Sequence, residues 1–464
     1  MRNRMTGILV TCAIMLFFNI IPAPEGLPVE GWRILGVLFS TIVLWLTNAF
    51  PRYIVTLFII AAVVLTGCYE SMNAALMQFM TNASIMVIGS FLLASMLSKT
   101  SIPLRAVGRF VRITKDSGKL FMLVIFVVTT LLSSVCDDIT ALTIMYAFVV
   151  SLFGIERGIV TAENRELKAG LMIGLPVAAY AGGLITPVGA PSNVICIDML
   201  RNATGIDLNF TQWFIIMLPT AFIIIIALWV FLCITLKPGK IDPETYTSLQ
   251  QATSLGKWTS QEKKAVVILI SMLTLWFSST FFSFLTSSLV ICIFACIMFM
   301  PHVNVVTHDD FMKHSSWDLF FLMPGVMIMA HVCQKSGLIE WLMQFVYGPL
   351  SGMSPLIAIL FASFSIMFLR IAIPAGPPVA ILSIPALIGV ASVLGINPVV
   401  MMSVGTIWGT LAFLLPIDIL RAYTYDLGQF SIKEMWKAEL PTILVVLVLV
   451  SMYLPVVINL VVPL

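Results

Sequence analysis

"AGGLITPVGAPSNVI", residues 181–195, is an apolar segment interrupted by five helix-breaking residues: Gly182, Gly183, Pro187, Gly189 and Pro191. Proline removes a backbone donor and glycine weakens a helix, so the segment cannot form one continuous helix. Within a bilayer, unwound backbone is tolerated only where it is buried in protein or lines a wet cavity, because lipid cannot satisfy the freed amides and carbonyls. The segment therefore predicts a broken helix beside an internal cavity.

The composition of the whole chain indicates a membrane protein. Of the 464 residues, 60% are hydrophobic and 10% are charged, and the mean hydropathy is +1.05. A soluble globular domain of this size does not show such values. Because one bilayer crossing takes about 20 mostly apolar residues, we expect an all-α polytopic membrane protein with about 11 transmembrane helices, several of them broken. The lipid bilayer is the expected surrounding, and nothing suggests a nucleic-acid partner.

The basic residues predict the orientation of the chain. A basic start and an apolar run, residues 1–20, are followed by no convincing cleavage site, so we expect a retained first helix with a cytoplasmic N-terminus. Residues 98–119 carry six basic side chains and are also expected at the cytoplasmic face. The predicted location is the plasma membrane, as a multi-pass protein of a bacterial inner membrane.

A polar connector, residues 237–264, divides the chain into residues 1–236, with an N-terminal helix and a first repeat, and residues 265–464, with a second repeat. The halves resemble each other, because "ITPVGAPSNVI" (185–195) is paralleled by "LLPIDILRAYT" (414–424) at a similar place. Weak repetition at about half the chain length is typical of secondary transporters, whose repeats hold a substrate near the bilayer midplane.

Each half contains a second interruption. In the second half it is "RIAIPAGPPVAILSIPA" (370–386), and "SSVCDDITAL" (133–142) occupies roughly the same place in the first half. Carbonyls freed at such breaks, together with the side-chain oxygens of Thr186 and Asn193, suit a dehydrated monovalent cation, whereas the N-termini of half-helices suit an anion. Four interruptions in two pairs therefore predict a shared binding cavity.

Several segments resemble the divalent anion/sodium symporter family. They are "VLWLTNAFP" (43–51), with Asn48 where the family has Glu, and the Gly-Gly-x-x-Thr-Pro-x-Gly-x-x-x-Asn pattern that ends at Asn193. The resemblance implies two inverted repeats with re-entrant hairpins, a homodimer and an elevator motion. It also implies transport of small anions, namely dicarboxylates, tricarboxylates, sulfonates or sulfate, coupled to a cation or by exchange and without an organic cofactor.

Family members hold substrate and sodium through Ser-Asn-Thr motifs at the hairpin tips, facing the Thr-Pro loops. The resemblance therefore implies that the substrate-binding residues are Cys136, Asp137, Asp138, Ala190, Ala375, Gly376, Pro377 and Arg421. The implied residues of the first cation site are Ser133, Asp137, Thr186, Gly189 and Asn193. Neither tip motif is intact in this sequence.

The departures from the family pattern change the expected charges. Asp137 adds a carboxylate where the family has an amide, and a carboxylate in a low-dielectric cavity should hold a cation or take up a proton. At the second site Gly376 and Pro377 bring no ligands, whereas Arg421 brings a guanidinium. We hypothesise that Arg421 replaces the second sodium of the family as a fixed countercharge, grips the anion and pairs with Asp418, which predicts altered sodium sites and fewer coupling sodium ions. Na⁺ or H⁺ is the expected coupling ion, with H⁺ carried by Asp137 or Asp138. Arg370 is a further candidate for attracting an anion.

Other interpretations remain open. "SSVCDDITAL" also resembles the Ser-x-x-x-Asp-Asn-x-x-Thr stretch of arsenite permeases and sodium/proton antiporters, with Asp138 in the place of their Asn. An intramembrane aspartyl protease would need two of Asp137, Asp138 and Asp418. Because neighbouring residues on a helix point about 100° apart, Asp137 and Asp138 cannot form its dyad unaided, and we expect no enzyme. The eight cysteines lack Cys-x-x-Cys pairs, so we expect no metal-binding cluster.

Overall fold

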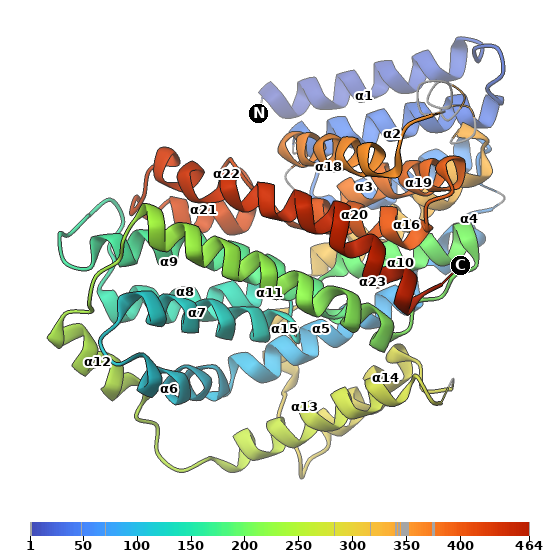
Figure 1. Cartoon of the computed structure of the whole chain (residues 1–464). Coiled ribbons are helices and arrows are strands. Elements are labelled where there is room, and N and C mark those ends of the chain that lie inside the picture. Colours follow the sequence, from blue (N-terminus) through green and yellow to red (C-terminus); the bar gives the residue numbers. More distant parts are fainter. Residues whose placement is uncertain are drawn as a thin grey trace.

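The computed structural model describes residues 2–47, 49–69, 71–282, 284–315, 317–338, 341, 344, 352–373 and 376–463, and Figure 1 shows how they are arranged. Over these residues the backbone forms helices and connecting turns, without a strand; one isolated bridge joins Ser117 and Lys240. The prediction of an all-α fold is confirmed.

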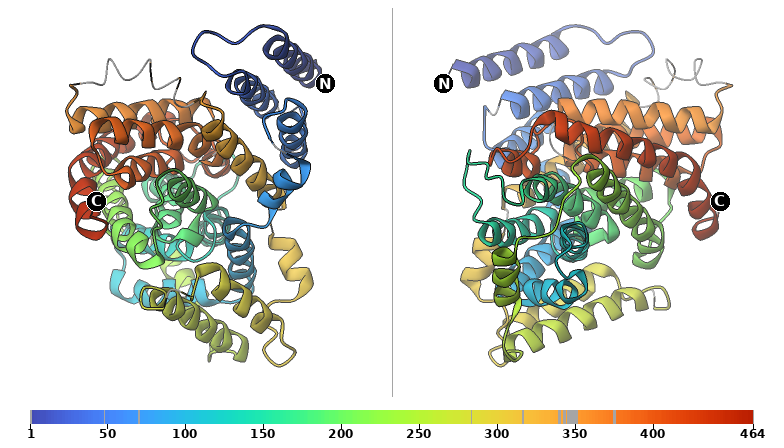
Figure 2. Two further views of the ribbon diagram at one scale, coloured as in Figure 1. Left: turned by 90° about the vertical axis from the view of Figure 1, so that its right-hand side faces the viewer. Right: turned by 60° about the vertical axis from the view of Figure 1, so that its left-hand side comes forward.

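The N-terminal helices lie at one edge of the molecule, where α1 packs along α2 (Figures 1 and 2). Leu9, Leu16 and Ile20 of α1 are exposed, as lipid-facing side chains of a membrane helix are. The elements of this part are α1 (Arg2–Ile20), α2 (Val29–Thr47), α3 (Arg52–Leu65), α4 (Met72–Leu76) and the short 3₁₀ helix η1 (Met77–Phe79).

The first half of the chain builds the centre of the molecule. Its elements are α5 (Asn82–Ser98), α6 (Ile102–Thr114), α7 (Gly118–Ser133), α8 (Asp138–Phe153), α9 (Arg165–Ile185), η2 (Pro187–Gly189), α10 (Pro191–Thr204) and α11 (Phe210–Thr235). Helix α9 packs against α7, α8 and α11, and all its residues from Leu167 to Ile185 are buried. The basic segment predicted at the cytoplasmic face forms α6, which is bent by 63° from α5.

Glycines let α9 lie close to α7. A Cβ on Gly174 would lie 1.9 Å from the ring of Phe126, and a Cβ on Gly182 would lie 2.3 Å from the backbone oxygen of Thr130. Larger residues at these positions would push the two helices apart. The same glycines that weaken the helix thus also bring its broken end against the end of α7.

The predicted connector has structure of its own. It contains α12 (Pro243–Thr253), and α13 (Ser260–Ser278) starts before its predicted end; α14 (Ser287–Phe299), α15 (His308–His314) and α16 (Trp317–Lys335) follow. Helices α13 and α14 lie along the edge opposite to α1 (Figure 1). The domain boundaries at residues 236 and 265 stay a prediction.

The second half repeats the order of the first: a helical hairpin, a broken helix and a long helix. Its elements are α18 (Pro355–Ala372), α19 (Gly376–Leu394), α20 (Pro398–Thr410), α21 (Ile419–Tyr425), α22 (Ile432–Val448), the π-helical turn η3 (Leu449–Tyr453) and α23 (Leu454–Val461). The long helices α11 and α22 pack against each other across the two halves. Whether the repeats are inverted stays a prediction.

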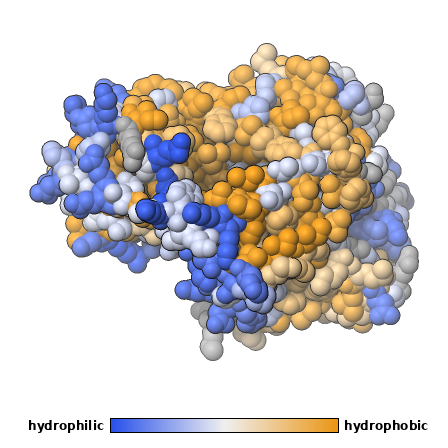
Figure 3. Space-filling view, turned by 90° about the horizontal axis from the view of Figure 1, so that it is seen from below, coloured by the Kyte–Doolittle hydropathy of each residue, from blue (hydrophilic) through white to orange (hydrophobic). Residues whose placement is uncertain are grey.

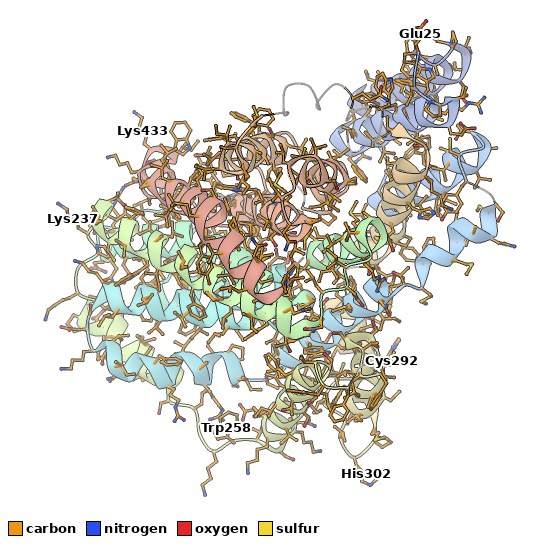
Figure 4. All side chains as sticks on the ribbon, turned by 45° about the vertical axis from the view of Figure 1, so that its right-hand side comes forward. Glu25, Lys237, Trp258, Cys292, His302 and Lys433 are labelled. Atoms are coloured by element: carbon orange, nitrogen blue, oxygen red, sulfur yellow. The ribbon has the colours of Figure 1, made fainter. Side chains whose placement is uncertain are left out.

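Four described helices are long and apolar enough to cross a bilayer: Arg165–Ile185, Phe210–Thr235, Gly376–Leu394 and Ile432–Val461. Further apolar helices are shorter, so the predicted number of spans stays a prediction. The space-filling view shows broad apolar surface, with polar residues gathered toward one side (Figure 3). Lys237 and Lys433 project outward from one edge, where α11 ends and α22 begins (Figure 4). This distribution supports an integral membrane protein.

Candidate functional site

The tip of the first hairpin, between α7 and α8, contains the two adjacent acids. Asp137 is the N-cap of α8: its carboxylate accepts hydrogen bonds from the backbone N–H of Thr140 at 3.0 Å and from its hydroxyl at 2.7 Å. Such a cap stabilises a helix by about 1 kcal/mol. The next residue, Asp138, lies in the first turn, where the helix dipole favours a negative charge. Asp137 therefore has a local structural role as well as its predicted one.

The first hairpin tip is joined to the break between α9 and α10. The Thr186 hydroxyl donates to the backbone oxygen of Ser134 at 2.5 Å and accepts from the backbone N–H of Gly189 at 3.1 Å. The Ser133 hydroxyl donates to the backbone oxygen of Ala179 at 2.6 Å. Thr186 and Gly189, both predicted for the first cation site, thus lie in one hydrogen-bonded network with the hairpin tip, and Ser133, also at that tip, binds α9.

Asn193 closes this network from the first turn of α10. Its side-chain amide donates to the backbone oxygens of Gly183 at 2.6 Å and Thr186 at 2.9 Å. Its Oδ1 is buried and accepts no hydrogen bond from the described residues. Buried polar atoms are nearly always partnered, and an oxygen of this kind beside unwound backbone is a suitable ligand for a dehydrated cation. The first break therefore fits a monovalent cation.

The second hairpin tip lies between α18 and α19. The predicted substrate residue Ala375 lies outside the described residues, so nothing follows for it. Gly376 and Pro377 begin α19, and neither has a side-chain oxygen with which to bind a ligand. The Arg370 guanidinium, one turn before the tip, donates to the backbone oxygen of Ile373 at 3.3 Å.

A cavity of about 90 Å³ lies where all four interruptions meet. Asp138 and Ile139 line it from the first hairpin, and Gly376 and Pro377 from the second. The two helix breaks contribute Ala190, Pro191, Ser192, Thr410, Asp418, Ile419 and Leu420, and the remaining lining residues are Tyr180 and Arg370. Six predicted residues are thereby brought together: Asp138, Ala190, Arg370, Gly376, Pro377 and Asp418. Cys136, Asp137 and Arg421 do not line this cavity.

The cavity contains a buried ion pair. Arg370 Nη2 lies 2.7 Å from Asp418 Oδ2, and both side chains are at least nine-tenths buried. Asp418 is also the N-cap of α21, accepting from the backbone N–H of Leu420 at 3.1 Å, and the Tyr180 hydroxyl donates to it. With Asp138, the cavity holds two carboxylates and one guanidinium.

The structure corrects the predicted partner of Arg421. The guanidinium is 2% exposed and forms an ion pair with Glu439 of α22, whereas Asp418 pairs with Arg370. The expected pair of Arg421 with Asp418 is therefore wrong. Sequence reasoning missed Glu439, which lies on α22 outside the motifs, and Tyr180, which lies on α9 just before the Gly-Gly pair and finds its partner 238 residues away. A charged residue in an apolar segment is itself a signal of function, and this signal applies to Glu439.

Comparisons with known proteins agree with this architecture. The profile of the family described as "Sodium:sulfate symporter transmembrane region" matches residues 2–460. The "Sodium-dependent dicarboxylate transporter SdcS" of Staphylococcus saprophyticus is 22% identical over 484 residues, covering 98% of this chain and 92% of that protein. The transporter of the same name from Staphylococcus aureus strain bovine RF122 is 22% identical over 469 residues, covering 95% of this chain and 89% of that protein.

Among solved structures, the crystal structure of the YdaH transporter of Alcanivorax borkumensis is similar, with a TM-score of 0.56 at 12% identity and 99% of both chains covered. This likeness concerns the fold alone. The family match spans nearly the whole chain, and it agrees with the four interruptions that meet at one cavity. The chain therefore belongs to the sodium:sulfate symporter family, the divalent anion/sodium symporters, and it is a transporter and not an enzyme.

Proposed function

We propose that the protein is a secondary active transporter of small anions, which bind at Arg370 in the cavity between the four interruptions. The observation that carries this proposal is a buried guanidinium at that cavity, 5% exposed. Arginine suits carboxylate, sulfonate and sulfate because its planar fork offers paired donors. The starts of α8, α10, α19 and α21 also line the cavity, and helix N-termini favour anions.

The cavity volume limits the size of the anion. About 90 Å³ is small beside the roughly 300–1,000 Å³ of pockets for drug-sized ligands. Sulfate, a small sulfonate or a short dicarboxylate fits this volume better than a tricarboxylate such as citrate. The anion reaches Arg370 by competing with Asp418 for its donors.

We further propose Na⁺ as a coupling ion, bound at the first helix break by the network of Ser133, Thr186, Gly189 and Asn193. Two relatives named as sodium-dependent dicarboxylate transporters support this assignment. The same helix break that would bind this cation also places Ala190 at the anion cavity. Bound Na⁺ thereby fixes the break in the geometry that receives the anion. A homodimer, inverted repeats, an elevator motion and a cytoplasmic N-terminus complete the proposal.

Uptake by proteoliposomes tests the function. Radiolabelled succinate and sulfate are offered with an inward Na⁺ gradient, and with choline in place of Na⁺. Arg370→Gln should lower Na⁺-dependent uptake at least tenfold, whereas Arg157→Gln should leave it unchanged. Arg157 is a matched control because it pairs with Asp426 at the surface, with its side chain 73% exposed. Unchanged uptake by Arg370→Gln would refute the proposed anion site.

Asp138 favours a second candidate function. With Asp138 and Asp418 both ionised, the cavity holds one more negative charge than Arg370 balances, and an anion can enter only if a cation or proton neutralises the excess. Proton coupling, or the cation exchange of antiporter-like relatives, would use this acid. An inward proton gradient, acidic outside and without Na⁺, separates the cases. If it drives uptake, protons are the coupling ion, and Asp138→Asn should abolish that uptake.

A further inference from the structure

The two helix breaks place different residues at the same position. Helix α10 follows the first break with Ala190 as its N-cap, and α21 follows the second with Asp418 as its N-cap. Counted from these caps, Asn193 and Arg421 are each the third residue of their helix. The two side chains therefore start from corresponding points beside the two breaks.

Both side chains tie their helix to the unwound loop that precedes it. Asn193 does so directly, through the backbone oxygen of Thr186, and it also binds the backbone oxygen of Gly183 near the end of α9. Arg421 does so through Glu439, whose other carboxylate oxygen accepts from the backbone N–H of Leu414 at 2.9 Å. The mechanical role is the same at both breaks.

The loop held by Glu439 has a conformation that needs support. Leu414 has a φ of +73°, in the left-handed region that side chains other than glycine rarely adopt. Glu439 binds its N–H, and the Trp436 indole donates to its carbonyl oxygen. Both partners belong to α22, so protein groups alone fix the loop at the second break.

The two breaks differ in what they leave for a ligand. Asn193 leaves a buried oxygen that accepts no hydrogen bond from the described residues, whereas Arg421 leaves two buried donors, Nε and Nη2. A guanidinium has no acceptor atom and carries a permanent positive charge. In a medium of low dielectric constant it repels a second cation. Since Gly376 and Pro377 of the adjoining hairpin have no side-chain oxygens, the second break does not fit sodium.

We propose that Arg421, neutralised by Glu439, is a built-in cation that replaces a bound ion at the second break, so that the protein binds its coupling Na⁺ at the first break alone. This inference rests on the proposed sodium coupling and limits it to one ion per protomer. Arg421 then acts as a positioning residue: it keeps the loop between α20 and α21 in place at every Na⁺ concentration.

The test measures the number of Na⁺ ions bound per protomer of purified full-length protein in detergent. Binding of radioactive Na⁺ is measured by a scintillation proximity assay in the absence of a substrate anion. Arg421→Asn gives the second break the side chain of the first and leaves Glu439 as an additional oxygen ligand. It should bind one more Na⁺ per protomer than the wild type. Arg421→Lys keeps the positive charge and should leave the count unchanged.

Two results would overturn the inference: wild-type protein that binds two or more Na⁺ per protomer, or folded Arg421→Asn protein that binds no more than the wild type. If Arg421→Asn does not fold, the number of Na⁺ ions bound by the wild type decides the question alone. Asn193→Ala tests the proposed first site separately. If that variant binds as much Na⁺ as the wild type, the first site is wrong, while the difference between Arg421→Asn and the wild type still decides the role of Arg421.

Discussion

Replacement of Asn193 by Ala removes two functions of one side chain, and they can be measured separately. The first is structural, since the amide joins α10 to the end of α9 through the oxygens of Gly183 and Thr186. The second is the proposed ligation of Na⁺ by Oδ1. We therefore expect the variant to be less stable without sodium and to gain little stability when sodium is added.

Both effects have an estimated size. Each of the two hydrogen bonds contributes about 1 kcal/mol net, so the variant should lose about 2 kcal/mol of unfolding free energy in choline. For the wild type, Na⁺ at a hundred times its dissociation constant adds about 2.7 kcal/mol by mass action. Asn193→Ala should lose most of this second contribution.

Both contributions to stability can be measured by thermal unfolding of the purified protein in detergent. The buffers form a series in which Na⁺ replaces choline at constant ionic strength. Asn397→Ala is a matched control. Asn397 is also a buried asparagine at the start of a helix, where its amide donates to the backbone oxygen of Val462 at 2.8 Å. It should lose stability but keep the response to Na⁺. If Asn193→Ala keeps the wild-type sodium response, the assignment of the cation to the first break is refuted.

Three further predictions concern the framework of the site. Asp137→Ala should destabilise the protein by about 1 kcal/mol through loss of the α8 cap, whereas Asp137→Asn, which keeps an acceptor, should stay within a few tenths of the wild type in denaturant unfolding. Gly182→Ala should cost more than 1 kcal/mol, because its Cβ meets the Thr130 carbonyl oxygen at 2.3 Å; wild-type stability would contradict the close helix approach. At the start of α13, the Arg105 guanidinium, together with hydrogen bonds from Thr259, lowers the pKa of the Glu262 carboxyl from 4.5 to about 2. The stabilisation by this carboxylate should be complete above about pH 4.5 and be lost as the pH falls toward 2, and Arg105→Gln should weaken that pH dependence of the melting temperature, leaving the part due to hydrogen bonds with Thr259.

Local sequence rules predicted the first helix break well. The prolines and glycines of residues 181–195 break a helix wherever they occur, and the structure ends α9 at Ile185 and begins α10 at Pro191. The hydroxyl groups of Ser133 and Thr186 donate hydrogen bonds to the backbone oxygens of Ala179 and Ser134. Their place beside the first break agrees with the sequence pattern, and their role in cation binding stays a prediction.

The charged residues of the second half were harder to predict, because their partners are set by packing. The sequence paired Asp418 with Arg421, three residues away, whereas in the structure the end of α18 brings Arg370 to Asp418. Arg421 finds its carboxylate on α22, 18 residues further along the chain, and no local spacing rule indicates such a contact. The same applies to Tyr180, which reaches Asp418 across 238 residues. Of the two adjacent acids, Asp138 lines the cavity and Asp137 caps the helix, a division that depends on the backbone direction at the hairpin tip.

Each charge has a separate role in the proposed mechanism. Arg370 and Asp418 hold the anion cavity, Asp138 sets its excess negative charge, and Arg421 with Glu439 stabilises the second loop. The first break, with neutral oxygens around Asn193, is left for the coupling cation. A mobile ion is thus proposed at one break and a fixed guanidinium at the other.

The central claim is that the transported anion lies against Arg370, between the two hairpin tips and the two helix breaks. A cryo-electron microscopy map of the protein in lipid nanodiscs, with Na⁺ and whichever of succinate or sulfate is taken up, tests it directly. We predict density for the anion within hydrogen-bond distance of the Arg370 guanidinium. Anion density only elsewhere, for example beside Asp198 and Arg201 in the cavity between α10 and α14, would contradict the account.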